Sequence, residues 1–85
     1  MAEFSVGQVV ISRQGKDAGL VYVVGGLEAN GRVNLIRPPK FNTSHMKAKN
    51  PKHLQPTGKR AEELIAMIEA GQDIDAGYFH RSVLS

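Results

Sequence analysis

Short runs of β-branched residues, separated by glycine and proline turns, dominate the first two thirds of the chain. Residues 6–13 and 20–24 predict two strands, because both runs are rich in such residues and too short for helices. The second run is apolar at nearly every position, which indicates a strand that is buried on both faces or tightly curved. Residues 32–37 begin with alternating polar and apolar side chains, so they predict a third, half-exposed strand.

Glycine-rich turns separate these runs. Gly15 and Gly19 bracket a charged pair between the first two strands, which predicts a tight turn there. The pair Gly25-Gly26 interrupts the second strand and predicts a bulge or a sharp bend. The pair Asn30-Gly31 is typical of a hairpin turn, here between the second and third strands.

The segment after Pro38-Pro39 has a weaker pattern. A short fourth strand is expected within residues 44–49, inside an otherwise polar and basic loop. A turn then leads to one apolar anchor, Leu54, and the β region is expected to end at Pro56, since proline cannot donate to a ladder. Together these signals predict a mainly β fold, a small barrel of about five strands.

The hydrophobic period changes to about 3.6 residues after Thr57. Apolar side chains then recur at i, i+3, i+4 and i+7, which predicts a helix over residues 58–70. Thr57 is a candidate N-cap, and Gly71 is a candidate residue just past the C-terminus of this helix. The apolar positions are Ala61, Leu64, Ile65 and Ile68.

A length of 85 residues predicts one small domain with a modest core. Within it, the barrel is expected over residues 1–57. A C-terminal helical extension is expected over residues 58–85, packed on or beside the barrel. Its last part, residues 73–85, is expected to hold a second short helix that carries Phe79 and Val83.

The absence of cysteine excludes disulfides and thiolate metal sites. The most apolar run, residues 20–27, is far shorter than the roughly 18–20 residues that a membrane-spanning helix needs. The sequence also shows no secretory segment. We therefore expect a cytoplasmic protein that has no membrane partner.

The net charge of +3 is unevenly distributed. Residues 29–61 contain no aspartate or glutamate, whereas the segment after them is acidic. This asymmetry favours a face that binds a polyanion, although a solvated basic surface without a specific partner is the alternative. The acid-free window holds eight of the eleven basic residues, namely Arg32, Arg37, Lys40, Lys47, Lys49, Lys52, Lys59 and Arg60.

Residue types that carry catalysis or bind metals occur without the required spacing. His45 and His53 are eight positions apart and His80 is remote, which is not a recognised ligand pattern. No serine lies in a nucleophile-elbow motif, and Gly15-Lys16 lacks the upstream glycine and the following Ser or Thr of a phosphate-binding loop. We therefore expect no metal, no cofactor and no enzymatic activity.

Two motifs connect the chain to a known family. Val6-Gly-Gln-Val-Val10 is followed, after four residues, by Gly15-Lys-Asp-Ala-Gly19 and the apolar strand at residues 20–24. This arrangement resembles the KOW family of RNA-binding barrels. The basic stretch Lys47-Ala-Lys-Asn-Pro-Lys-His-Leu-Gln55 is similar to small bacterial KOW proteins that are related to large-subunit ribosomal proteins of the archaeal and eukaryotic type.

The resemblance implies an SH3-like barrel that binds structured RNA, with ribosomal RNA as the expected partner and ribosomal proteins as further contacts. Lys and Arg would neutralise phosphates, and glycines would let the backbone approach them closely. We expect the protein to act as a monomer. The candidate RNA contacts are Arg13, Gln14, Gly15, Lys16, Gly19, Arg37, Lys40, Phe41, Lys47, Lys49, Lys52 and His53.

Two alternatives stay open at this point. The ring of Phe41 either stacks on an unpaired base or packs on the open end of the barrel. The whole domain could instead be an SH3-like protein-interaction module, because fold alone does not decide function. In that case the apolar stripe of the C-terminal helix, with Met67 and Phe79, would dock on another protein.

Overall fold

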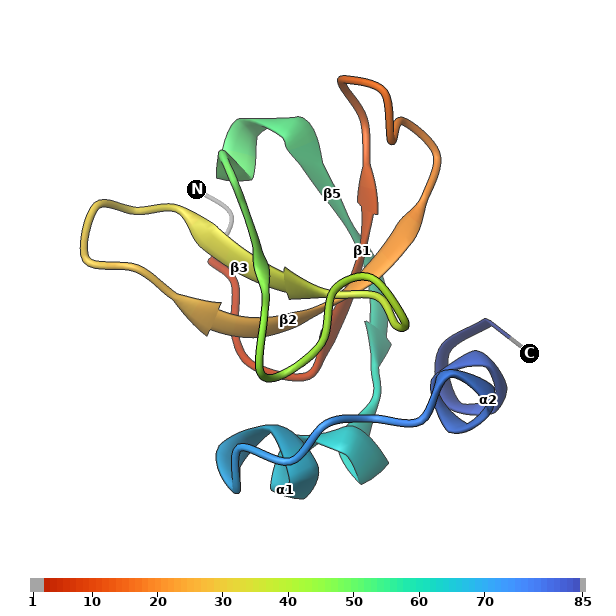
Figure 1. Ribbon diagram of the computed structural model, residues 1–85. Coiled ribbons are helices and arrows are strands. Elements are labelled where there is room, and N and C mark those ends of the chain that lie inside the picture. Colours follow the sequence, from red (N-terminus) through yellow and green to blue (C-terminus); the bar gives the residue numbers. More distant parts are fainter. Residues whose placement is uncertain (1–2, 85) are drawn as a thin grey trace.

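The computed structural model describes residues 3–84, and it confirms a mainly β fold that ends in short helices (Figure 1). The strands are β1 (Gln8–Ser12), β2 (Val21–Leu27), β3 (Val33–Ile36), β4 (Lys47–Lys49) and β5 (Leu54–Arg60). The helical elements are the 3₁₀ turn η1 (Pro51–His53), α1 (Glu62–Glu69), α2 (Ala76–Phe79) and the π-helical turn η2 (His80–Leu84).

All five strands join one antiparallel sheet in the order β4-β3-β2-β1-β5. The predicted Asn30-Gly31 hairpin connects β2 to β3, where the Glu28 N–H donates to the Arg32 carbonyl at 2.8 Å. The strands β4 and β5 are the two edges, and they do not pair with each other within residues 3–84. The sheet is therefore open, and the closed barrel that the sequence suggested is not confirmed.

The bend predicted in β2 is present. The register between β2 and β3 shifts between Val24 and Gly26, as a bulge requires. A Cβ atom at Gly25 would lie 2.7 Å from Met46 Sδ and 2.8 Å from Ile36 Cδ1. Glycine therefore makes room for two side chains that cover the sheet at this point.

Successive residues of the central strands point to opposite faces and fill two separate clusters. In β2, Val23 lies in the cluster shared with the C-terminal helices, whereas Tyr22 and Val24 lie in the other. In β1, Val9 and Val10 divide in the same way. Of the two alternatives for the second strand, burial on both faces is confirmed.

The helix α1 begins at Glu62, four residues later than the sequence predicts, so the predicted start is wrong. The strand β5 continues past Pro56 through Arg60, because these residues pair with β1. The predicted cap Thr57 lies in this strand and donates its hydroxyl to the Val9 carbonyl at 2.9 Å. The boundary expected after Thr57 therefore falls inside β5.

The predictions for the end of the chain agree better with the structure. Gly71 follows the C-cap Ala70 with a φ of 73°, so it is the residue just past the helix, as predicted. The short helix expected after it is α2, which continues into η2. Phe79 and Val83 of these two elements are both buried, and Ser85 lies outside the described residues.

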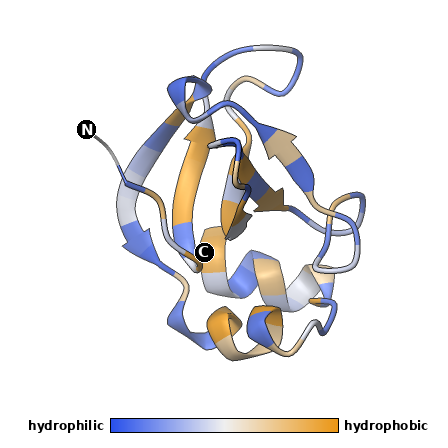
Figure 2. Ribbon diagram, turned by 90° about the vertical axis from the view of Figure 1, so that its left-hand side faces the viewer, coloured by the Kyte–Doolittle hydropathy of each residue, from blue (hydrophilic) through white to orange (hydrophobic). Residues whose placement is uncertain are grey.

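The C-terminal helices lie against one face of the sheet (Figures 1 and 2). Leu64 and Ile68 of α1 and Phe79 of α2 join Val9 and Val23 in one buried cluster. The apolar stripe that a docking partner would need is therefore largely used inside the domain. No helix within residues 3–84 has the length and apolar character needed to cross a membrane.

Candidate functional site

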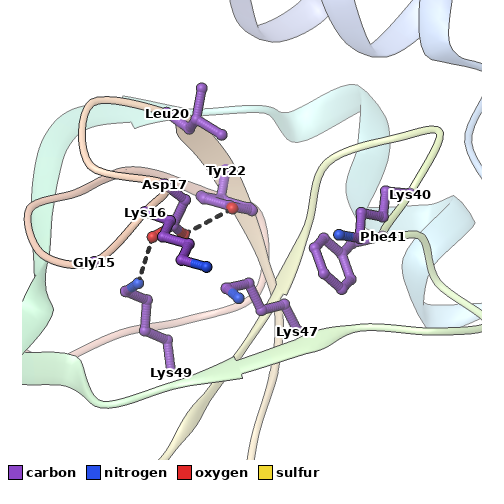
Figure 3. A pocket seen from close by; sticks show the side chains of 9 residues that line it. All are labelled: Gly15, Lys16, Asp17, Leu20, Tyr22, Lys40, Phe41, Lys47 and Lys49. Carbon is purple, nitrogen blue, oxygen red and sulfur yellow. Dashed lines mark hydrogen bonds and ion pairs between the residues drawn. The ribbon is translucent and has the colours of Figure 1, made fainter.

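A hollow of about 500 Å³ opens between the β1–β2 loop, the loop after β3, and β4 (Figure 3). We call it the lysine pocket, because four of the nine residues that line it are lysines. These residues come from separate parts of the sequence, so the fold creates the pocket. They are Gly15, Lys16, Asp17, Leu20, Tyr22, Lys40, Phe41, Lys47 and Lys49.

Asp17 is the polar anchor of the lysine pocket, and only 15% of its side chain is exposed. Its Oδ1 accepts hydrogen bonds from Lys49 Nζ at 2.7 Å and Ser12 Oγ at 3.1 Å. Its Oδ2 accepts one from the Tyr22 hydroxyl at 2.8 Å. Burial raises the pKa of this carboxyl, but the three hydrogen bonds and the charge of Lys49 outweigh burial and lower the pKa to about 2.

Tyr22 completes this anchor from the sheet side, because its ring is buried in β2 while its hydroxyl reaches the loop. Burial raises the pKa of Tyr22 above its ordinary value, and the hydrogen bond to Asp17 and the negative charge of that carboxylate raise it further. The phenol therefore stays protonated and keeps donating to Asp17. This contact fixes the β1–β2 loop on the start of β2.

The free energy of unfolding is expected to fall as the pH drops from about 4 to about 2, because Asp17 takes up a proton. The pKa of Asp17 is lower in the folded than in the unfolded state, so its full contribution to the free energy of unfolding is present above the unfolded pKa. This contribution is lost as the pH falls through the folded pKa. We expect a contribution of about 1–2 kcal/mol, allowing for partial solvent screening. Urea denaturation across this pH range should show a smaller loss for Asp17→Asn than for the wild type. Equal losses would contradict the assignment.

Lys49 is held as a structural cation. Only 11% of its side chain is exposed, and its ammonium group donates to Asp17 Oδ1 and, at 2.9 Å, to the Gln14 carbonyl. Since Lys49 lies on β4 and Asp17 on the β1–β2 loop, the ion pair joins the edge strand to the loop. A contact between Lys49 and a ligand stays a prediction. The charge of its ammonium group is already balanced by Asp17.

The other three lysines of the pocket have no ion-pair partner within residues 3–84. Lys16 comes from the β1–β2 loop, Lys40 from the loop after β3, and Lys47 from β4. Figure 3 shows the ammonium groups of Lys16 and Lys47 directed toward the same region. Four lysines and one carboxylate leave the pocket with three net positive charges. An anion bound among these charges would be attracted by each of them and would reduce their mutual repulsion.

Phe41 forms the aromatic wall of the pocket. Lys40 Nζ lies 5.5 Å and Lys47 Nζ 5.2 Å from the centroid of its ring, within the range of cation–π attraction. The ring of His45 stacks on Phe41, with centroids 5.8 Å apart and planes inclined by 23°. Phe41 also packs against the buried cluster around Tyr22. Its stacking on a base stays a prediction.

Four hydrogen bonds tie the loop after β3 to the segment between the two helices. The Asn42 amide donates to the Ile74 carbonyl at 2.9 Å and accepts from the Ile74 N–H at 2.7 Å. The backbone N–H and the hydroxyl of Ser44 donate to the two carboxylate oxygens of Asp73 at 2.8 and 2.9 Å. The C-terminal region thereby fixes the loop that carries two residues of the pocket.

Half of the twelve candidate contacts from the sequence line the lysine pocket. The structure thus brings the glycine loop and part of the basic segment together, which sequence alone did not show. The candidates that line the pocket are Gly15, Lys16, Lys40, Phe41, Lys47 and Lys49.

The remaining candidates do not line the pocket. Gln14 offers its backbone carbonyl to Lys49, and Gly19, with a φ of 92°, closes the turn. The Arg37 guanidinium donates to the Val21 carbonyl at 2.9 Å, so it braces the sheet.

Three further candidates lie together on the side of the β1–β2 loop that faces β5, namely Arg13, Lys52 and His53. The Arg13 N–H donates to the His53 carbonyl at 2.8 Å, and its guanidinium donates to Gln55. Lys52 is exposed in η1 next to His53. These three residues form a basic flank that is continuous with the β1–β2 loop.

Sequence reasoning missed three residues of the pocket, namely Asp17, Leu20 and Tyr22. Asp17 was seen only as half of a charged pair in a turn. The sequence does contain a signal for this contact, because Asp17 lies between two glycines and precedes Tyr22, a strand residue, by five positions. With this spacing the Tyr22 hydroxyl lies over the loop.

No group of three or more His, Asp or Glu side chains within residues 3–84 is placed to hold a metal ion. No protein-family model and no curated protein matches the chain. The KOW resemblance therefore rests on the motif residues alone and remains a proposal.

Proposed function

We propose that this protein binds RNA through the lysine pocket and its basic flank. The observation that carries the proposal is the convergence, from separate segments, of the ammonium groups of Lys16, Lys40 and Lys47, for which residues 3–84 supply no ion-pair partner. An RNA backbone supplies phosphates at regular spacing, and each neutralised phosphate releases condensed counterions. The single carboxylate of the pocket, Asp17, is already paired with Lys49, so it opposes an incoming anion only weakly.

The protonation states in the pocket favour binding over catalysis. A general acid or base works best with a pKa near the operating pH. The pKa of Asp17 is about 2, and the pKa of Tyr22 is raised above its ordinary value. Neither group exchanges protons readily near neutral pH, so we propose a binding protein rather than an enzyme.

The geometry of the β1–β2 loop is compatible with the KOW resemblance. The Ala18 N–H donates to the Gly15 carbonyl at 3.2 Å, and the Leu20 N–H donates to the Asp17 carbonyl at 3.0 Å. The resulting tight turn presents Lys16 to solvent. We propose, from the resemblance, that the partner is ribosomal RNA in the cytoplasm, contacted by a monomer, with ribosomal proteins as further contacts.

Lys16→Glu is expected to weaken binding to purified ribosomal RNA by about tenfold at low salt. It should also reduce the slope of log affinity against log salt concentration by about one, because one phosphate contact is lost. The fold should persist, since Lys16 is exposed and has no ion-pair partner within residues 3–84. Filter binding at several salt concentrations measures both quantities, and thermal denaturation checks the fold.

Arg32→Glu is the matched control. Arg32 is exposed beside the β2–β3 turn, which lies far from the β1–β2 loop (Figure 1), and the charge change is the same. A much smaller effect of this variant supports a localised site. Equal effects of the two variants would indicate nonspecific electrostatic attraction without a localised site. A wild type that fails to bind at low salt would overturn the proposal.

A further inference from the structure

We infer that the lysine pocket holds one unpaired nucleotide, with its base against the Phe41 ring and its phosphate among the lysines. The inference rests on the proposed RNA binding and specifies which feature of an RNA the site recognises. Such a feature is a bulged or looped-out nucleotide rather than a continuous double helix.

The shape of the site separates these two kinds of RNA. The hollow of about 500 Å³ falls within the roughly 300–1,000 Å³ of pockets that enclose small ligands. A double helix carries its phosphates outside and its stacked bases inside. It can therefore touch the lysines, but its bases stack on one another and present no free face to the Phe41 ring. An unpaired nucleotide can use the lysines and Phe41 together.

The Phe41 ring lines the pocket, and the ammonium groups of Lys40 and Lys47 lie over it at 5.5 and 5.2 Å, so a stacked base would displace these flexible side chains from the ring. His45 stacks on the ring but is not among the residues that line the pocket, so this contact lies outside it. The other aromatic residue of the pocket, Tyr22, is buried and its hydroxyl is engaged by Asp17. Phe41 is therefore the ring of this pocket that can stack on a base, and such stacking tolerates any base.

The lysines next to the ring are within reach of the phosphate of a stacked nucleotide. The ammonium groups of Lys40 and Lys47 are 5.5 and 5.2 Å from the ring centroid, so a base that takes their place on the ring would leave both cations beside it. Lys16 approaches the same space from the opposite loop (Figure 3). An aromatic wall with cations on two sides suits a base linked to its own phosphate.

Three RNA duplexes test this inference: a continuous duplex, the same duplex with one bulged nucleotide, and the bulged duplex with that nucleotide abasic. Fluorescence anisotropy should show that the wild type binds the bulged duplex about tenfold more tightly than either of the others. In Phe41→Leu this preference should vanish, while the affinity for the continuous duplex stays. Leucine keeps the apolar packing of Phe41 but offers no ring.

Tyr78→Leu is the matched control, because it replaces an aromatic ring that does not line the pocket, and it should keep the full preference. A preference that persists in Phe41→Leu would overturn the inference. Equal binding of all three RNAs, with a steep salt dependence, would overturn the inference but leave the proposed RNA binding intact. An absence of binding to every probe at low salt would overturn both.

A measurement on the wild type removes any dependence on the stability of the variants. Phe4 and Phe79 are buried, whereas Phe41 lines the pocket. Base stacking should therefore shift the NMR signals of the Phe41 ring protons on titration with the bulged duplex. The abasic duplex should leave these signals nearly unchanged. Identical shifts with both duplexes, or none with the bulged one, would contradict the inference.

Discussion

Replacement of Asp17 by asparagine is expected to lower the free energy of unfolding by about 2–3 kcal/mol. The substitution keeps the size of the side chain but removes the charge that pairs with Lys49, whose side chain is only 11% exposed. The new amide group also turns a donor toward Tyr22 or toward Ser12, both of which donate to the present carboxylate. Removing the partner of a largely buried cation lowers the free energy of unfolding more than removing the partner of an exposed one. Urea denaturation near neutral pH measures the change.

Glu69→Gln is a suitable control, because this exposed carboxylate lies at the end of α1, and a change within about 0.5 kcal/mol is expected for it. An Asp17→Asn variant as stable as this control would show that the anchor does not support the loop. The pKa of Tyr22 should also fall toward its ordinary value in Asp17→Asn, since the negative charge beside it is gone. An absorbance titration of the phenol follows this shift.

Phe79→Ala is expected to cost about 3–4 kcal/mol, because it opens a cavity in the cluster between the helices and the sheet. Phe79 is 2% exposed and shares this cluster with Val9 and Val23 of the sheet. The sheet and the C-terminal helices should therefore unfold in a single transition, in the variant and in the wild type. Circular dichroism and tyrosine fluorescence, recorded on the same urea series, measure the loss and the cooperativity.

Leu84→Ala serves as the control for this experiment. Leu84 lies in η2, close to Phe79 in sequence, but it is 38% exposed, so a loss below about 1 kcal/mol is expected. Two separate transitions would contradict the single cooperative core. They would instead support a helical extension that folds independently of the sheet.

Local patterns predicted most of the fold. The β-branched runs gave β1 and β2, and Gly25-Gly26 marked the bulge, because these signals depend on neighbours in the sequence. The start of α1 was missed for a physical reason. Thr57 has the side chain of a cap, but it lies in β5, which pairs with β1, and its hydroxyl donates to the Val9 carbonyl, 48 positions earlier.

The lysine pocket was only partly predictable. Lys16 and Lys47 follow from the basic character of their segments, but the sequence does not show that they meet. Lys49 was counted among the candidate contacts, whereas the structure pairs it with Asp17, 32 positions away. Charge counting identifies a basic face, and only the tertiary contacts show which of its cations are unpaired.

The open sheet leaves two edges, and an unpaired edge can add a strand from another copy of the protein and begin aggregation. Both edges carry residues that oppose this. Two of the three residues of β4 are lysines, and β5 carries Pro56, which has no N–H to donate. The charge of Lys47 is therefore expected to oppose strand addition, in addition to the polyanion contact that we propose for it. An RNA bound over β4 would in turn shield this edge from strand addition.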